Sequence, residues 1–279
     1  MPISCIIRPP SILSTPKRLA NAITNIQSEH ARERGNAVTV RTYSSRSEYL
    51  GAAVRRSDQH RHTILSLHPA VFDSRGPDCV DGSNTRAFFL KTKAAQRKSL
   101  EAAGIPTVPC ATTRDEAEGM SSPTGSFVAR PLHHSQGRGW RVTDRATDFD
   151  ERIEYIQPLL HKRREFRVLA SFGEPLVTLR KRVPEEMSPL APWNHSEGSV
   201  FITIREQANN QLSRSGFLER LVQNSHPGIS NAALYGLDVI QDFSNNFYVL
   251  EVNSCPSLAI EENLDVIARH LVTKFNSGV

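Results

Sequence analysis

Two acidic residues and an amide near the C-terminus have the types and the spacing of a metal site. Glu251 and Asn253 stand two apart in "FYVLEVN", so they share one face of a strand. Asp238 lies in the preceding apolar run "GLDVIQD", and the "SNN" between the runs predicts a turn. In the resulting antiparallel hairpin, Asp238 falls opposite Glu251 or Asn253. Mg²⁺ prefers a few protein oxygens completed by phosphate and water, so the three residues predict a magnesium site.

The alternative is that Glu251 forms a buried salt bridge with a nearby arginine or lysine. It directly follows an apolar run, and burying a carboxylate there is costly unless a partner offsets its charge. We expect that partner to be Mg²⁺, shared with Asp238 and Asn253 and completed by phosphate and water. Pro256 then stiffens the exit from the strand, and we expect Cys255 to be a packing residue.

The first third of the chain has a pattern of its own. Short β-branched runs alternate there with amphipathic or irregular stretches, and the segment ends in the turn-rich "DSRGPDCVDGSN". This order predicts a small, largely parallel sheet with covering helices. The expected strands are 3–8, 37–43 and 63–69, and the expected helix is 14–34.

From Thr85 onward the pattern predicts a helix and then mostly antiparallel strands. The helix runs through Ala103 and ends at Gly104, because glycine accepts the left-handed conformation and Pro106 cannot continue a helix. The remaining expected elements are strands at 126–132 and 154–160, a hairpin over 165–183 that turns at "FGEP", a helix in "GFLERLVQNS", the hairpin that carries Asp238, and a C-terminal amphipathic helix in "ENLDVIARHLVTKF".

Four segments resemble the motifs of ATP-grasp ligases, in the order that the family has them. They are "KTKAAQRKSLEAAGIPTVP", "FVARPLHHSQGRGWRV", "REFRVLASFGEPLVTLRKRV" and "GLDVI…FYVLEVNSCPSL", and they cover about residues 85–260. The similarity is to the RimK-like, D-alanine–D-alanine ligase-like and glutathione synthetase-like branches. It implies an α/β (α+β) ATP-grasp fold with two α+β subdomains that clasp ATP, after a small Rossmann-like domain. The implied boundaries are 1–84, 85–160 (lid) and 161–279 (metal-binding).

The resemblance also implies roles for particular residues. Arg130 stands where the family has its second phosphate lysine, which keeps the charge but changes the geometry of the contact. The residues implied to contact ATP are Lys93, Arg130, Gly137, Arg138, Gly139, the backbone of Gln157, Pro158, Leu159 and Leu160 around adenine, and Glu165 at the ribose. Those implied to be catalytic are Arg167, Arg180 and Lys181, and those implied to bind Mg²⁺ are Asp238, Glu251 and Asn253.

The segment 184–199 predicts a loop that contacts substrate. It has no periodic pattern, and a loop of this length is usually functional or mobile. Its candidates for substrate selection are Trp193, Asn194, His195 and Ser196. His133 and His134 could touch substrate or phosphate, although surface histidines are the simpler interpretation.

The resemblance implies an ATP-dependent carboxylate–amine ligase that forms an amide through an acyl-phosphate and releases ADP and phosphate. Its implied cofactors are ATP and one or two Mg²⁺ ions, with Mn²⁺ as a substitute. The alternatives are an ATP-grasp kinase that phosphorylates a hydroxyl or a carboxylate, and an ATP-binding module without chemistry. Small molecules or peptides that carry the carboxylate and the amine are the expected partners; a homo-oligomer and either substrate's identity stay open.

Composition narrows the class of protein further. The formal charge of +5 comes from 34 basic and 29 acidic residues, which are interspersed. With only seven tryptophans and tyrosines, a stacking surface for nucleic acid is not expected. Four separated cysteines form no CxxC pair, which favours a reducing compartment. No apolar run is long enough to span a bilayer, and no signal peptide is indicated, so we expect a soluble cytoplasmic enzyme.

Overall fold

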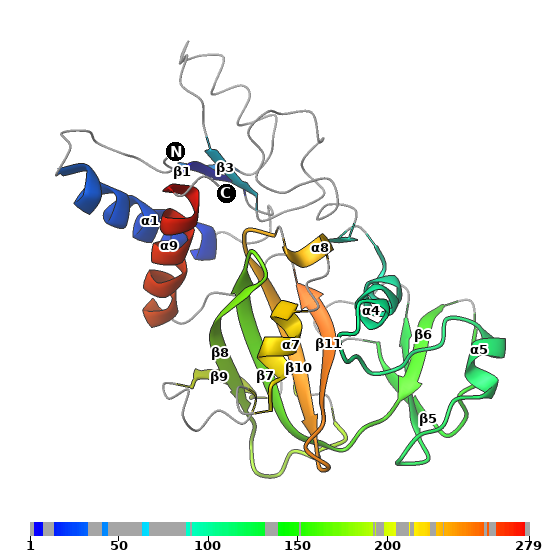
Figure 1. The fold of residues 1–279 in the computed structure, drawn as a ribbon. Helices are drawn as coiled ribbons and strands as arrows, with labels where there is room; N and C mark the ends of the chain where they lie inside the picture. Colours follow the sequence, from blue (N-terminus) through cyan, green and yellow to red (C-terminus); the bar gives the residue numbers. More distant parts are fainter. Residues whose placement is uncertain are drawn as a thin grey trace.

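The fold is known from a computed structural model of the chain (Figure 1). It has three sheets, and the central one carries the residues that the sequence analysis singled out. The structure describes residues 3–7, 14–32, 41–43, 63–66, 88–89, 91–131, 139–150, 152–191, 193, 198–204, 212, 215–223, 227–230, 232–253, 256 and 261–276.

The central sheet has five antiparallel strands in the order β11–β10–β7–β8–β9 (Figure 1). Two of its hairpins turn where left-handed backbone is required: Phe172 and Gly173 have φ values of 49° and 79°, and Asn245 has a φ of 66°. Positive φ values at both central residues match the right-handed twist of the flanking strands. The strands are β7 (Lys162–Ser171), β8 (Glu174–Arg182), β9 (Val200–Thr203), β10 (Tyr235–Asp242) and β11 (Phe247–Asn253).

The two faces of the central sheet bury different hydrophobic clusters. On one face Phe166 and Val168 of β7 pack with residues of two short helices, α7 (Phe217–Gln223) and α8 (Pro227–Ser230). On the other face Leu169 packs beneath the helices α1 and α9. Because side chains alternate along a strand, Glu165 and Arg167 continue the face of Leu169 beyond these helices.

A second sheet has three antiparallel strands in the order β5–β4–β6, and the helix α4 lies between it and β11 (Figure 1). Thr92 caps α4, since its side chain accepts from the N–H of Ala95, and Gly104 follows the helix with a φ of 76°. The elements are α4 (Lys93–Ala102), α5 (Arg114–Glu118), β4 (Phe127–Pro131), β5 (Arg141–Thr143) and β6 (Ile153–Pro158).

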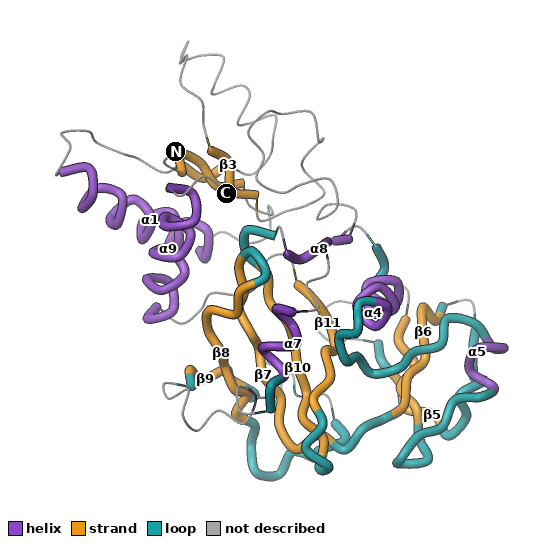
Figure 2. The backbone as a smooth tube through the Cα atoms, in the orientation of Figure 1, coloured by secondary structure: helices purple, strands orange, loops and turns teal. Residues whose placement is uncertain are grey.

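The third sheet is parallel, with the order β2–β1–β3. Figure 2 shows its strands above the helices α1 and α9. Its neighbouring helix α1 packs against α9, and both cover the central sheet: Leu19 and Ile23 of α1 contact the cluster that holds Leu169 and Ile267. The elements are β1 (Ile3–Ile7), α1 (Ser14–Arg32), β2 (Arg41–Tyr43), β3 (Thr63–Ser66) and α9 (Glu261–Asn276).

The predicted elements are largely confirmed where the structure describes them. The parallel strands, the helix that ends before Gly104, both hairpins and the C-terminal helix all form. The helix before Gly104, predicted to run from Thr85, begins only at Lys93, because Thr92 caps it. That the N-terminal part is Rossmann-like stays a prediction. The sequence analysis did not predict the short elements α5, β5, β9 and α8. No described helix is both long enough and apolar enough to cross a membrane.

Candidate functional site

The hairpin of β10 and β11 brings the three predicted metal ligands together, and a β-bulge is the reason. Asp238 pairs directly with Glu251, as the spacing predicted, but the next pair is Val239 with Val249. Leu250 is therefore an extra residue in β11, opposite no residue of its own. A bulge of this kind shifts the alternation of side chains that follow it.

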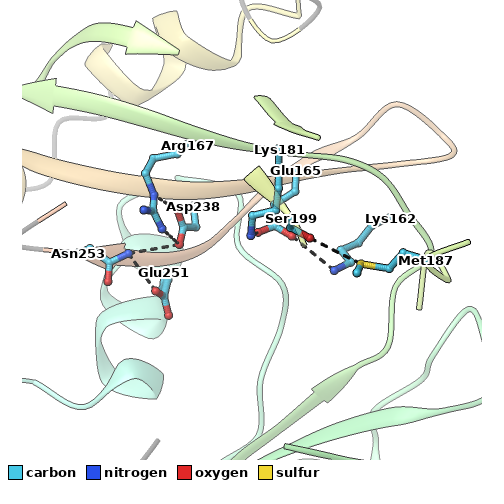
Figure 3. Close-up of polar contacts among 9 residues, drawn as sticks. All are labelled: Lys162, Glu165, Arg167, Lys181, Met187, Ser199, Asp238, Glu251 and Asn253. Atoms are coloured by element: carbon cyan, nitrogen blue, oxygen red, sulfur yellow. Dashed lines mark hydrogen bonds and ion pairs between the residues drawn. The ribbon is translucent and has the colours of Figure 1, made fainter. Parts of the chain in front are cut away.

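That shift decides which way Glu251 points. Val249 packs in the apolar cluster with Phe166, and simple alternation would send Glu251 to the same apolar face. Because of the extra residue, Val252 takes the apolar position instead, and Glu251 and Asn253 share the opposite face with Asp238 (Figure 3).

Asp238 is held by a two-pronged ion pair. Nε and Nη2 of Arg167 donate to its two carboxylate oxygens at 2.7 and 2.8 Å, and the pair is mostly buried. Burial raises the pKa of Asp238 above its ordinary value, although Arg167 opposes the rise. Burial by itself would lower the pKa of Arg167, but the charge of Asp238 and the hydrogen bonds to it outweigh burial and raise that pKa. The arginine therefore orients this carboxylate.

Glu251 accepts a hydrogen bond from an amide side chain. The amide nitrogen of Asn253 donates to Glu251 at 2.9 Å and to Asp238 at 3.3 Å, so it sits between the two carboxylates. Burial works to raise the pKa of Glu251, but Lys93, the Asn253 hydrogen bond, and the charges of Arg97 and Arg167 outweigh it and lower the pKa. The sequence analysis considered a buried ion pair with arginine for Glu251, but the structure places such a pair at Asp238.

A second cluster lies beside the first on the same face, on β7 and β8 (Figure 3). Glu165 forms ion pairs with Lys181 and with Lys162, whose Nζ lies 3.5 Å away. Burial lowers the pKa of Lys162 against the pull of Glu165, and the charges of Lys181 and Arg130 lower it further. Two ammonium groups therefore flank one carboxylate. Sequence analysis missed Lys162, because nothing in "HKRR" separates it from its exposed neighbours.

Aromatic rings cover these cations. The Phe201 ring lies 4.6 Å from the Arg167 guanidinium and 4.9 Å from the Lys181 ammonium. Trp193, from the predicted substrate loop, lies 4.5 Å from the Lys162 ammonium and donates its indole N–H to Ser188 at 3.1 Å. Each contact is attractive through the ring quadrupole. Of the two catalytic candidates on β8, only Lys181 is in this cluster, because Arg180 is exposed on the other face.

The cations expected to bind phosphate lie at the edges of this face. Lys93 donates to the backbone carbonyl of Val252 at 3.1 Å, whereas Lys91 is exposed and the Lys98 side chain is 40% exposed. Nε of Arg130 is buried and has no hydrogen-bond partner among the described residues. Gly139 has a φ of 73°, and a Cβ there would lie 3.1 Å from Pro131.

Solved structures with a similar fold are numerous. No protein-family model matches the chain, and no curated protein matches it either. A complex of the ATP-grasp ligase PsnB with a phosphomimetic variant of minimal precursor, Mg and ADP has a TM-score of 0.62 and 15% identity, covering 97% of this chain and 98% of that one. D-alanine–D-alanine ligase from Bacillus anthracis with ATP has a TM-score of 0.56 and 12% identity, covering all of both chains.

N5-carboxyaminoimidazole synthetase from Staphylococcus aureus has a TM-score of 0.59 and 11% identity, covering 97% of this chain and 77% of that one. These matches extend over nearly the whole chain. The protein has the ATP-grasp fold. The resemblance carried by the four sequence motifs is thereby confirmed at the level of the fold.

In ATP-grasp terms, the predicted adenine segment Gln157–Leu160 joins the small sheet to the central one. The Gln157 side chain is buried and bonded to Arg97. Leu159 uses its N–H with the carbonyl of Ser126 at 2.9 Å and its carbonyl with the hydroxyl of Thr124 at 2.9 Å. Any contact of this backbone with adenine stays a prediction.

Several predicted ATP-grasp residues lie outside the described part of the chain. These are Gly137 and Arg138 of the phosphate-covering loop and Asn194, His195 and Ser196 of the substrate loop, together with His133 and His134. Two residues that the sequence analysis did not select lie inside the site's framework: Lys162, and Arg97, which is buried between α4, β6 and β11.

The donor set fits the Mg²⁺ and the nucleotide that an ATP-grasp fold implies. Two carboxylates and an amide meet within hydrogen-bonding distance, and the Asn253 nitrogen between the carboxylates marks a position where positive charge is stabilised. Among the described residues, no three His, Cys, Asp or Glu side chains are placed to hold a metal ion, so a Mg²⁺ bound here would need phosphate and water to complete its ligands. The unpartnered Arg130 Nε is a donor suited to a phosphate oxygen.

Proposed function

We propose that this protein is an ATP-dependent ligase that joins a carboxylate to an amine through an acyl-phosphate and releases ADP and phosphate. The observation that carries the proposal is the meeting of Asp238, Glu251 and Asn253 on the sheet face that also holds the cations Lys162 and Lys181. Oxygen ligands for a hard cation beside buried ammonium groups suit a nucleotide triphosphate and its metal.

Each group of residues would have its own role. Asp238, Glu251 and Asn253 would hold Mg²⁺ or Mn²⁺, which neutralises charge on the transferring phosphoryl group when bound. Arg167 keeps Asp238 oriented through its two hydrogen bonds. The cations that would bind phosphate oxygens are Lys93, Arg130, Lys162 and Lys181, and Glu165 would accept from the ribose.

The reaction requires two displacements. An oxygen of the substrate carboxylate attacks the γ-phosphorus as the bond to ADP breaks, and the amine nitrogen then attacks the acyl carbon as phosphate leaves and the amine loses a proton. The protein's contribution to such phosphoryl transfer is positioning and charge stabilisation, which fixed ammonium and guanidinium groups supply. Phe201 and Trp193 shield these groups from water on one side.

We propose small molecules or peptides as the substrates that carry the carboxylate and the amine. The support is that PsnB structures contain a precursor peptide and that another neighbour is a D-alanine–D-alanine ligase. We also propose that the small sheet belongs to a lid subdomain, residues 85–160, and the central sheet to a metal-binding subdomain, residues 161–279. Two separate sheets joined by a short connection support this division.

The test is ADP release by the purified protein, screened against pairs of amino acids and short peptides with hydroxylamine present to trap an acyl-phosphate. We expect ADP release that requires Mg²⁺ and a carboxylate, and hydroxamate in place of amide when hydroxylamine is added. Glu251→Gln should lose this activity. Asp265→Asn, a change at an exposed carboxylate of α9, should keep it.

Three outcomes would contradict the proposal in different ways. A stable phosphorylated product without any need for an amine would indicate a kinase. ATP binding without ADP release in any substrate pair would indicate a binding module. Full activity of Glu251→Gln at saturating substrate would remove the assigned metal ligand.

A further inference from the structure

The helix α4 places two cations on the outer edge of β11, on either side of Glu251. Lys93 and Arg97 are four residues apart and therefore share one face of the helix. Nζ of Lys93 lies 3.1 Å from the carbonyl oxygen of Val252, and Nε of Arg97 lies 2.7 Å from that of Leu250. Both acceptors belong to the outermost strand of the central sheet.

Leu250 is the residue that the bulge inserts. An inserted residue is left out of the ladder with the neighbouring strand, so its carbonyl needs another partner. Arg97 provides that partner, and a guanidinium bond to a carbonyl is stronger than one between neutral groups. The bulge is thereby tied to α4 at the residue just before Glu251.

Arg97 is itself held in one orientation. Its side chain is 3% exposed, its Nη1 donates to the side chain of Gln157, and its guanidinium lies 4.9 Å from the ring centre of Tyr155. Both partners belong to β6 of the small sheet. A buried cation with three fixed contacts on two sheets has little freedom to move.

We propose that Arg97 is a positioning residue that keeps the Leu250 bulge in place and so keeps Glu251 on the polar face. Through Gln157 and Tyr155 it also fixes the bulge relative to the small sheet. Without the bulge, alternation would turn Glu251 toward the apolar cluster that contains Val249. Arg97 touches neither nucleotide nor metal in this scheme and acts through its hydrogen bond to the carbonyl of Leu250. The inference rests on the proposed function, because it concerns the orientation of a carboxylate that is proposed to bind the metal.

The experiment measures Mn²⁺ affinity in the presence of ADP by electron paramagnetic resonance, ADP affinity without metal by calorimetry, and melting temperature. We expect Arg97→Met to weaken Mn²⁺ binding tenfold or more while metal-free ADP affinity changes less than threefold. Arg97→Lys, which can reach one acceptor but lacks the fork for both, should fall between. Lys98→Met, the neighbouring exposed cation on α4, is the matched control and should bind Mn²⁺ as the wild type does.

The outcomes separate this inference from the proposed function. Wild-type Mn²⁺ affinity in a folded Arg97→Met protein overturns the inference alone. Equal losses of Mn²⁺ and metal-free ADP affinity, in step with the melting temperature, also overturn it, because they indicate a general structural role. If Arg97→Met does not fold, Arg97→Lys decides between the same outcomes. A wild-type protein that binds no Mn²⁺–ADP overturns the proposed function and this inference together.

Discussion

Arg167 is the residue whose replacement should disturb the candidate site most. Its two bonds to Asp238 are 2.7 and 2.8 Å long, and the side chains are only 16% and 11% exposed. Arg167→Met keeps most of the volume but leaves a buried carboxylate without its cation. Removing one partner of a buried ion pair costs about 3–5 kcal/mol, and the lost contact with Phe201 adds about 0.5–1 kcal/mol.

We therefore expect Arg167→Met to lower the free energy of unfolding by about 3 kcal/mol or more, which corresponds to roughly 6 °C or more in melting temperature. Thermal unfolding followed by circular dichroism measures the change. Arg269→Met is the matched control, because Arg269 forms a similar 2.9 Å bond to Asp265 on the exposed face of α9. Its melting temperature should stay that of the wild type.

The double variant Arg167→Met/Asp238→Asn tests the cause. If the loss comes from an uncompensated carboxylate, replacing that carboxylate with an amide should restore a large part of the stability. The reasoning is refuted if Arg167→Met melts like the Arg269→Met control, or if the second substitution adds its own loss with no recovery.

Three further predictions concern packing and pH. Gly236→Ala should destabilise the protein by about 1–3 kcal/mol in denaturant unfolding, because a Cβ there would lie 2.9 Å from a proline carbon, whereas Gly119→Ala, with open space, should not; equal effects would contradict this. Gly139→Ala should cost more than Gly125→Ala, since both have left-handed backbone but only the first meets a neighbour, at 3.1 Å; an equal cost would show that the contact relaxes freely. The Lys98 hydrogen bond, with help from Thr112, lowers the pKa of Glu116 to about 2, so its stabilising effect should be complete above its ordinary pKa of 4.5 and disappear as the pH falls toward 2. The melting difference between wild type and Glu116→Gln should accordingly shrink between pH 5.5 and pH 3, with a contribution of about 1 kcal/mol at most for this half-exposed group; a constant difference would disprove it.

Local patterns in the sequence predicted much of the fold around the site. The hairpin of β10 and β11 followed from two apolar runs and an asparagine turn, and the pairing of Asp238 with Glu251 is confirmed. The end of α4 at Gly104 is confirmed because a left-handed glycine is a local requirement. Such features depend on a few neighbouring residues, which is why a sequence carries them plainly.

The bulge at Leu250 could not be predicted in the same way. Spacing alone gives the relation of Glu251 to Asn253, but not the relation of either to the buried Val249, because an inserted residue leaves no trace in a run of apolar letters. The partners of Arg97 and Lys162 are equally hidden. Each depends on strands that are distant in sequence, and neighbouring cations such as Lys98 have the same type but remain exposed.

The balance of charge on the polar face connects these details. Among the described residues it carries three carboxylates, Asp238, Glu251 and Glu165, and three cations, Arg167, Lys162 and Lys181. Two more cations lie on neighbouring elements: Lys93 on α4, and Arg130 on β4, whose buried Nε has no partner among the described residues. Buried charges are costly unless opposite charges compensate them, so an excess of cations favours a ligand with several negative charges. Asp238 and Glu251 lie on β10 and β11, whereas the ammonium groups of Lys162 and Lys181 lie with Glu165 on β7 and β8. The first pair therefore forms an acidic end, and the second group has a net positive charge. A metal-bound polyphosphate has this same order of charges, and a single anion or a metal ion alone would satisfy only one end.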